Sequence, residues 1–154
     1  MRTETIIFKT SSEAATADLG EALGRRIDGG VCICLAGSLG VGKSVFVRGL
    51  CRGLGVDEDV LSPTFILFEE YEGRFPVIHL DLYRLEHESD IEEIGVFDRI
   101  GDGSVIVVEW GDRSEYIFDV SDVVLTLEIA GETDRRISVS CDSDHMFLFE
   151  GLQP

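Results

Sequence analysis

Apolar residues in the first half of the chain form short unbroken runs separated by stretches with helical periodicity. Val31–Ala36 is a continuous apolar run, typical of a strand buried on both faces of a sheet. A stretch from Glu13 to about Ile27 precedes it and Lys43–Leu54 follows it, and both repeat apolar residues at helical spacing before a glycine. With a first strand at Glu4–Phe8, this order predicts an α/β fold.

Local capping chemistry predicts where the first helix begins. Thr10, Ser11, Ser12 and Glu13 have the spacing of a capping box, in which the first side chain accepts a backbone N–H and the acid reaches back. We therefore expect Thr10 at the head of this helix.

The second half of the chain changes character part of the way along. Two strands joined by a turn, a helix and a buried strand are expected first, at Thr64–Tyr71, Phe75–Leu82, Ser89–Ile100 and Ser104–Glu109. Three strands separated by turns are expected after them, at Val123–Ala130, Arg135–Cys141 and Met146–Glu150. The pattern predicts a mostly parallel central sheet followed by an antiparallel C-terminal meander.

Composition and sequence add three constraints. The chain has 154 residues and a net charge of −17, with 12 acidic and 8 basic residues up to residue 83 and 18 acidic and 5 basic residues after it. Such a chain repels a phosphate backbone, so we expect no direct binding of nucleic acid. No apolar run approaches the roughly 20 residues of a membrane span, and no secretory segment begins the chain, which favours a cytoplasmic location. The four cysteines show no metal-binding spacing, so we expect reduced, inert thiols.

The segment between the buried strand and the second helix matches a phosphate-binding loop. Gly37–Ser44 fits G-x-x-x-x-G-K-[ST] at every fixed position. Its glycines let backbone N–H groups turn toward phosphate oxygens, and the following helix adds its positive end. Lys43 supplies a charge to the outer phosphates, and Ser44 supplies a hydroxyl to Mg²⁺. The residues expected at the nucleotide are Ser38, Leu39, Gly40, Val41, Gly42, Lys43 and Ser44.

Two acids end strands where a Mg²⁺ ligand is expected. Asp81 ends the strand that begins at Phe75, and Glu109 ends the buried strand that begins at Ser104. Ligands of open α/β sheets bind at such carboxyl ends, so both are candidates for metal binding and catalysis, and the sequence does not choose between them. Ser62 and Thr64, in a Ser-Pro-Thr turn, are candidate sensors of the outer phosphate.

The choice between ATP and GTP can also be argued from the sequence. Common GTPases recognise guanine with an Asn/Thr-Lys-x-Asp segment. Apart from Lys43, the sole lysine is Lys9, and Thr-Ser-Ser follows it. ATP is therefore the expected nucleotide. The three histidines form no constellation, and His79 is expected to be structural.

Four motifs in order resemble the TsaE (YjeE) family of bacterial proteins. They are the phosphate-binding loop, Ser62-Pro-Thr-Phe65, His79-Leu-Asp-Leu-Tyr-Arg-Leu85 and Val108-Glu-Trp110. The resemblance runs from about residue 4 to residue 140. It implies a single P-loop NTPase-like domain over residues 1–154, with a three-layer fold. It also implies ATP binding, slow Mg²⁺-dependent hydrolysis, and work with the TsaB and TsaD proteins in tRNA threonylcarbamoyladenosine biosynthesis.

The resemblance also assigns roles to individual residues. Glu109 resembles the metal-linked acid of the family, and Asp81 resembles its other essential carboxylate. Trp110 matches the aromatic residue next to the metal-linked acid, and Thr10 falls where the N-terminal segment of the family approaches the nucleotide. Both are expected among the nucleotide-binding residues. The chain departs from the family pattern at Ser38, where Asp is common, and at Ser44, where Thr is common. It departs again after Trp110, where Gly-Asp-Arg replaces a Pro-containing segment.

Two other functions fit the phosphate-binding loop. A small-molecule kinase on the same fold needs an arginine-bearing lid, and the region between Leu82 and Gly103 offers only Arg84 and Arg99 as basic residues. A non-hydrolysing ATP switch needs only binding. Both alternatives stay open at the level of sequence.

Overall fold

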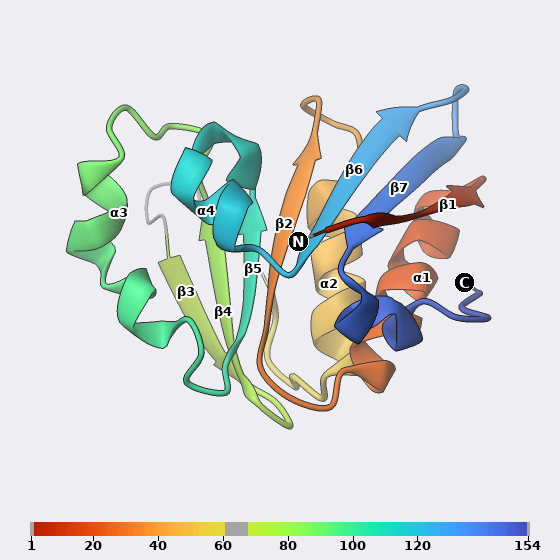
Figure 1. Cartoon of the computed structure of the whole chain (residues 1–154). Coiled ribbons are helices and arrows are strands. Elements are labelled where there is room, and N and C mark those ends of the chain that lie inside the picture. Colours follow the sequence, from red (N-terminus) through yellow and green to blue (C-terminus); the bar gives the residue numbers. More distant parts are fainter. Residues whose placement is uncertain (1, 61–67, 154) are drawn as a thin grey trace.

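The apolar run in the first half of the chain becomes the middle strand of a sheet. A computed structural model describes residues 2–60 and 68–153 (Figure 1). Within them the strands are β1 Glu4–Thr10, β2 Val31–Gly37, β3 Phe68–Glu72, β4 Pro76–Asp81, β5 Val105–Glu109, β6 Val123–Ile129 and β7 Arg135–Cys141. The α-helices there are α1 Glu13–Arg26, α2 Lys43–Gly53, α3 Ser89–Ile94 and α4 Glu115–Val120. Short 3-10 helices are η1 Val96–Arg99, η2 Gly111–Arg113 and η3 Ser143–Leu148.

The strands form one sheet in the order β1-β7-β6-β2-β5-β4-β3. The central pairs β6–β2, β2–β5 and β5–β4 are parallel. The outer pairs β1–β7, β7–β6 and β4–β3 are antiparallel. This confirms the predicted α/β class with a mostly parallel centre and an antiparallel C-terminal part.

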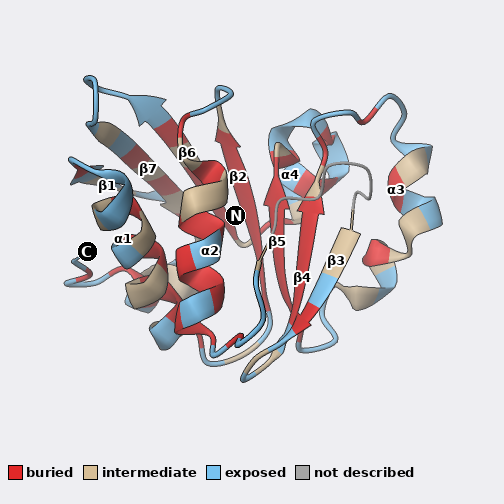
Figure 2. Ribbon diagram, turned by 180° about the vertical axis from the view of Figure 1, so that it is seen from behind, coloured by how far each residue is buried: buried red, intermediate tan, exposed pale blue. Residues whose placement is uncertain are grey.

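Helices cover both faces of this sheet and give it three layers. The helices α1 and α2 lie on one face, and α3 and α4 lie on the other (Figures 1 and 2). Alternate residues of β5 contribute to the two apolar cores: Val105 and Val107 pack on the side of α1 and α2, and Ile106 and Val108 pack on the other side. The sheet is therefore buried on both faces at its centre, as the apolar run at β2 predicted. None of the helices in the described ranges is long and apolar enough to cross a membrane.

The helices α1 and α2 approach so closely that their backbones touch. A Cβ atom on Gly49 of α2 would lie 1.9 Å from the carbonyl oxygen of Ala17, and one on Gly24 of α1 would lie 2.3 Å from that of Leu50. Backbone atoms do not move aside as the end of a side chain does. Glycine at these positions therefore sets the distance between α1 and α2.

Replacing Gly49 by Ala is expected to destabilise the protein by about 1–3 kcal/mol or more, because overpacking against backbone outweighs the gain of about 1 kcal/mol in helix propensity. The urea midpoint of unfolding measures this loss. Gly29→Ala is the matched control, since a Cβ there meets nothing within 4 Å. Equal midpoints for the two variants would contradict the close approach of the helices.

Three local predictions are wrong for identifiable reasons. Ser12, and not Thr10, caps α1, because its Oγ accepts the N–H of Ala15 at 3.0 Å while Thr10 ends β1. Residues 146–150 are not a strand: Asp142 caps η3 by accepting the N–H of His145 at 3.0 Å. The predicted helix at 89–100 is broken at Gly95, whose φ of 79° ends α3.

Other parts of the structure agree with the sequence or add to it. The four cysteines are buried and free, as expected, and burial raises the pKa of Cys34 and Cys51 to about 12. The helix α4, capped by Ser114, was not predicted because its six residues are too short for a periodic signal. The predicted strand at 64–71 begins outside the described residues, and its described part is β3.

Candidate functional site

The loop between β2 and α2 turns at the carboxyl end of the central strand. Gly37 and Gly42 adopt φ values of 136° and 110°, a region that side-chain-bearing residues rarely enter. Gly42 is the N-cap of α2 and has no side chain with which to cap it. The first N–H groups of the helix are therefore left for a ligand, and the helix dipole favours an anionic one.

Lys43 lies beneath this loop and is 4% exposed. Its Nζ donates to the carbonyl oxygens of Gly37 at 2.6 Å and Ser38 at 2.9 Å, and it lies 3.9 Å from the ring centroid of Trp110. Burial lowers the pKa of Lys43, and the Glu109 carboxylate acts in the opposite direction. The ammonium is thus held, largely dehydrated, inside the curve of the loop, where it attracts an anion strongly.

The two strand-end acids meet at one edge of the sheet. Asp81 and Glu109 are register partners in the parallel pair β4–β5. The hydroxyl of Ser44, in the first turn of α2, donates to Oε1 of Glu109 at 2.9 Å. Hard oxygen donors gathered in this way suit Mg²⁺, so the residues present fit the ion that the loop implies. This hydrogen bond joins Glu109 directly to the first turn of α2.

The environment of Asp81 differs from that of Glu109. Asp81 is half-buried, and its Oδ1 accepts the N–H of Tyr83 at 2.9 Å. Burial raises the pKa of the Asp81 carboxyl above its usual range; the Tyr83 N–H lowers it and the Glu109 charge raises it further. Keeping this group ionised in the folded state at neutral pH therefore opposes folding.

Replacing Asp81 by Asn is expected to stabilise the free protein at neutral pH. A carboxyl with a raised folded pKa costs stability fully above that pKa, and the cost disappears as the pH falls below the unfolded value of about 3.9. The gain should thus be present at about pH 7 and absent at about pH 3. Urea unfolding at both pH values measures it, and a variant that is less stable at neutral pH would contradict the electrostatic account.

The sequence missed one residue of this site. The structure places His79 against Glu109, with its Nε2 at 2.5 Å from Oε2, and both side chains are buried. A signal was available, because His79 and Asp81 are two residues apart in a strand and so share one face of the sheet. That face also carries Glu109, the register partner of Asp81.

Aromatic side chains cover the loop from the other side. Trp110 has a φ of 59°, the one positive value for a non-glycine residue in the described part of the chain. Its ring packs against Tyr83 with centroids 5.0 Å apart, and the guanidinium of Arg113 donates to the Tyr83 carbonyl. Strain of this kind is tolerated where the surroundings hold the residue in place. The turn brings the indole over Lys43.

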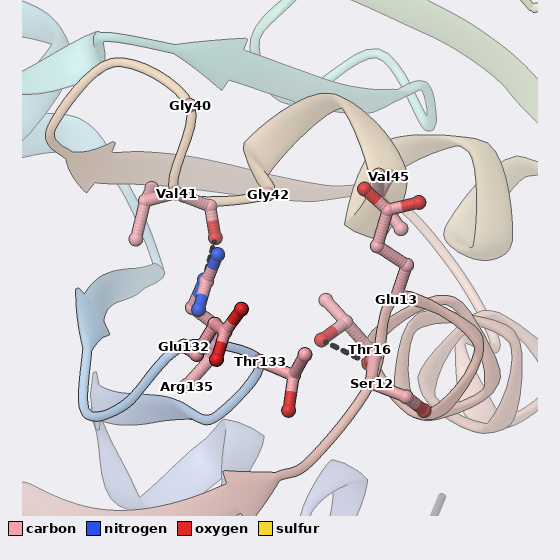
Figure 3. A pocket seen from close by; sticks show the side chains of 10 residues that line it. All are labelled: Ser12, Glu13, Thr16, Gly40, Val41, Gly42, Val45, Glu132, Thr133 and Arg135. Carbon is pink, nitrogen blue, oxygen red and sulfur yellow. Dashed lines mark hydrogen bonds between the residues drawn. The ribbon is translucent and has the colours of Figure 1, made fainter.

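Two cavities open on either side of the loop. The first, of about 370 Å³, is lined by Lys43, Ser44, Asp81, Glu109 and Trp110 among others. The second, of about 250 Å³, lies between the start of α1, the loop and the β6–β7 turn (Figure 3). Its described lining residues are Ser12, Glu13, Thr16, Gly40, Val41, Gly42, Val45, Glu132, Thr133 and Arg135. Gly40, Gly42, Glu13 and Val45 line both, so the loop forms the border between the cavities.

Arg135 ties the β6–β7 turn to the loop. Its Nε donates to the Val41 carbonyl at 2.9 Å, across the second cavity from the start of α1 (Figure 3). Glu13 and Thr133 face the same space from opposite walls (Figure 3). This cavity therefore has a fixed polar rim directly beside the glycines of the loop.

The remaining predicted site residues are placed as follows. Leu39 is 70% exposed at the tip of the loop, next to the exposed Ser38. Thr10 is buried, and its hydroxyl is 2.8 Å from that of Thr16; it does not line either cavity but stands behind a residue that does. Ser62 and Thr64 lie outside the described residues. Arg84 is exposed to solvent.

The fold and the loop together define the class: a three-layer P-loop NTPase-like α/β protein. Residues 10–137 match the family model described as "Threonylcarbamoyl adenosine biosynthesis protein TsaE". The chain belongs to the TsaE family, as the resemblance in the sequence indicated.

Individual relatives agree with the family assignment. The chain is 37% identical over 125 residues to the "tRNA threonylcarbamoyladenosine biosynthesis protein TsaE" of Treponema pallidum, covering 81% of this chain and 93% of that protein. It is 42% identical over 117 residues to the protein of the same name from Nostoc sp., covering 73% of this chain and 71% of the relative. The crystal structure of Bacillus subtilis YdiB superposes with a TM-score of 0.78 at 23% identity, over 97% of this chain and 94% of that one, which supports the fold.

Proposed function

We propose that this protein is a Mg²⁺-dependent ATPase of the machinery for tRNA threonylcarbamoyladenosine biosynthesis, and that it assists turnover of the TsaB–TsaD pair. One observation carries the ATPase part: Ser44 Oγ lies 2.9 Å from Glu109 Oε1 directly below the phosphate-binding loop. A hydroxyl of the loop and an acid at a neighbouring strand end are the two protein ligands that Mg²⁺ needs beside bound phosphates. Membership of the TsaE family supports the pathway.

In this proposal, each residue of the first cavity has a separate role in ATP hydrolysis. The N–H groups of the loop and the Lys43 ammonium would bind the phosphates, and Ser44 and Glu109 would hold Mg²⁺, whose charge would offset the negative charge of the phosphate oxygens. To the Asp81 carboxylate, at the same edge of the sheet as Glu109, we assign the role of orienting the attacking water and accepting its proton. Trp110 and Tyr83 exclude bulk water from the side of Lys43.

The second cavity is the proposed place for the nucleoside. Phosphates in the curve of the loop leave the ribose and base to continue past Gly40 and Gly42, where this cavity opens. Val41 and Val45 supply apolar walls, and the start of α1 and the β6–β7 turn supply polar groups. A largely preformed cleft with a few convergent polar groups is typical of nucleotide sites. ATP is the proposed nucleotide, since the guanine-recognition segment is absent from the sequence.

The charge of the chain supports action through protein partners. A net charge of −17 disfavours direct contact with tRNA, so the link to the tRNA passes through TsaB and TsaD in this proposal. Arg84 is exposed and lines neither cavity, so it is not in position to stabilise the transferred phosphate. If a partner supplies an arginine for this purpose, ATP hydrolysis would be slow for the protein alone and faster with the TsaB–TsaD pair. The proposed location is the cytoplasm, where these partners act on tRNA.

ATP turnover by the purified protein with Mg²⁺, alone and with the TsaB–TsaD pair from the same source, tests the proposal. We expect slow release of phosphate that the pair accelerates and that removal of Mg²⁺ abolishes. Binding without turnover in either mixture would favour the non-hydrolysing switch. Transfer of phosphate to a metabolite in place of its release would favour the kinase.

A further inference from the structure

His79 is a polar side chain in a position that an apolar one would fill more favourably. It is 1% exposed, and its strand neighbours Val77, Ile78 and Leu80 are apolar and fully buried. Its Nδ1 has no hydrogen-bond partner among the described residues. Burying a polar imidazole ring costs free energy, and only a hydrogen bond from its other nitrogen, Nε2, can offset that cost. That nitrogen makes its hydrogen bond to Glu109.

The hydrogen-bond geometry assigns the tautomer of this histidine. The Glu109 carboxylate only accepts, so the hydrogen lies on Nε2, which donates to Oε2 at 2.5 Å. Nδ1 is then a bare acceptor in apolar surroundings. A hydrogen on Nδ1 would be a buried donor with nothing to receive it, which costs about 1–3 kcal/mol. The geometry therefore places the hydrogen on Nε2.

The bond from His79 completes the fixation of Glu109. Oε1 accepts from Ser44 at 2.9 Å while Oε2 accepts from His79, so both oxygens of the carboxylate have a set direction. A glutamate side chain otherwise samples many rotamers, worth up to about 2 kcal/mol in entropy. With Oε2 taken by the imidazole, Oε1 is the oxygen that remains turned toward Ser44 and the loop.

We propose that His79 is a positioning residue, which orients the Glu109 carboxylate so that Oε1 is presented with Ser44 to Mg²⁺. This inference rests on the proposed function and adds to it a residue that touches neither nucleotide nor metal. Partners of this kind, one bond removed from a metal ligand, change metal affinity by about 10–100-fold when they are lost.

The first test compares two substitutions by the Mg²⁺ dependence of ATP binding, measured by calorimetry. His79→Leu removes the donor but suits the apolar site, whereas His79→Gln keeps an N–H at a similar reach. We expect His79→Leu to bind ATP without Mg²⁺ as the parent does, and to need about 10–100-fold more Mg²⁺ for the metal-dependent gain. His79→Gln should recover most of the parent's Mg²⁺ dependence.

A purely structural role for His79 predicts a different result. Leucine would then restore both the fold and the Mg²⁺ dependence, and glutamine would have no advantage over it. Thermal unfolding of both variants shows that each is folded. His79→Leu removes the unpaired Nδ1 but leaves the buried Oε2 of Glu109 without its donor, so we expect it to be less stable than the parent. An unchanged Mg²⁺ requirement in His79→Leu overturns the proposal.

A second measurement needs no nucleotide and separates this inference from the proposed function. Imidazole ¹⁵N spectra of the free protein report which nitrogen carries the hydrogen. We expect the Nε2–H form for His79, with a resonance that moves in Glu109→Gln. A ring with a hydrogen on Nδ1 and none on Nε2 overturns the positioning bond even if ATP is hydrolysed. If the spectrum is as expected but the protein does not bind ATP, the proposed function is wrong, whereas the hydrogen bond from His79 to Glu109 is still supported.

Discussion

Replacing Lys43 by Ala is expected to weaken ATP binding by about 10- to 100-fold or more. The ammonium is buried in the loop, and a hydrogen bond from a charged donor to phosphate is worth about 1.5–3 kcal/mol in such a place. Lys43 already has its Nζ directed into the loop by the Gly37 and Ser38 carbonyls, so little ordering is needed when phosphate binds. Calorimetric titration with Mg²⁺–ATP measures the loss.

The chain offers a matched control for this variant. Lys9, the other lysine in the sequence, is exposed on β1 and should tolerate Ala with no change in affinity. Because Lys43 also bonds loop carbonyls, circular dichroism and the urea midpoint should accompany the titration. Parent-like affinity in a folded Lys43→Ala protein would remove the loop from the nucleotide site.

Replacing Glu109 by Gln is expected to lower ATP turnover by about 10²–10³-fold while changing ATP affinity by less than about tenfold. Glutamine keeps the shape of the side chain and an oxygen that can accept from Ser44 or His79, but it removes the negative charge offered to the metal. Preorganised charge of this kind acts on the transition state more than on the bound substrate. The loss should therefore appear in turnover, measured as phosphate release at saturating ATP.

Glu72 provides the comparison for a strand-end acid without a role in the site. It ends β3 at the edge of the sheet and is exposed. Glu72→Gln should hydrolyse ATP at the parent rate. If Glu109→Gln also did so, with or without the TsaB–TsaD pair, Glu109 would be an ordinary buried acid and the Mg²⁺ site would have to be sought at Asp81.

Much of the fold and of the site could be predicted because local patterns and long-range geometry coincide there. The run Val31–Ala36 has no polar residue, so only a strand buried on both faces accommodates it. The pattern of Gly37–Ser44 by itself predicts a phosphate-binding loop. Asp81 and Glu109 stand at equivalent ends of parallel strands, and this alone brings them together as register partners.

The failures arise where competing local interactions decide the outcome. Ser12 and Thr10 both suit an N-cap, and pairing of β1 with β7 as far as Thr10 settles the choice. The apolar residues near Leu148 pack from a 3-10 helix because Asp142 caps it, although their pattern fits a strand equally well. His79 was assigned to the core because strand periodicity records burial and not the partner of a buried polar atom.

The contact between α1 and α2 has a mechanical consequence for the response to nucleotide. Helices usually meet through side chains, whose rotamers can change, and here backbone meets backbone at Gly20, Gly24, Gly49 and Gly53. If phosphates bound as proposed and tilted α2, this backbone contact would carry α1 with it. Ser12 and Glu13, at the start of α1, and the adjoining β1 would then be displaced in step with Lys43, so that strain at the loop reaches the far edge of the sheet without passing through the side chains of the core.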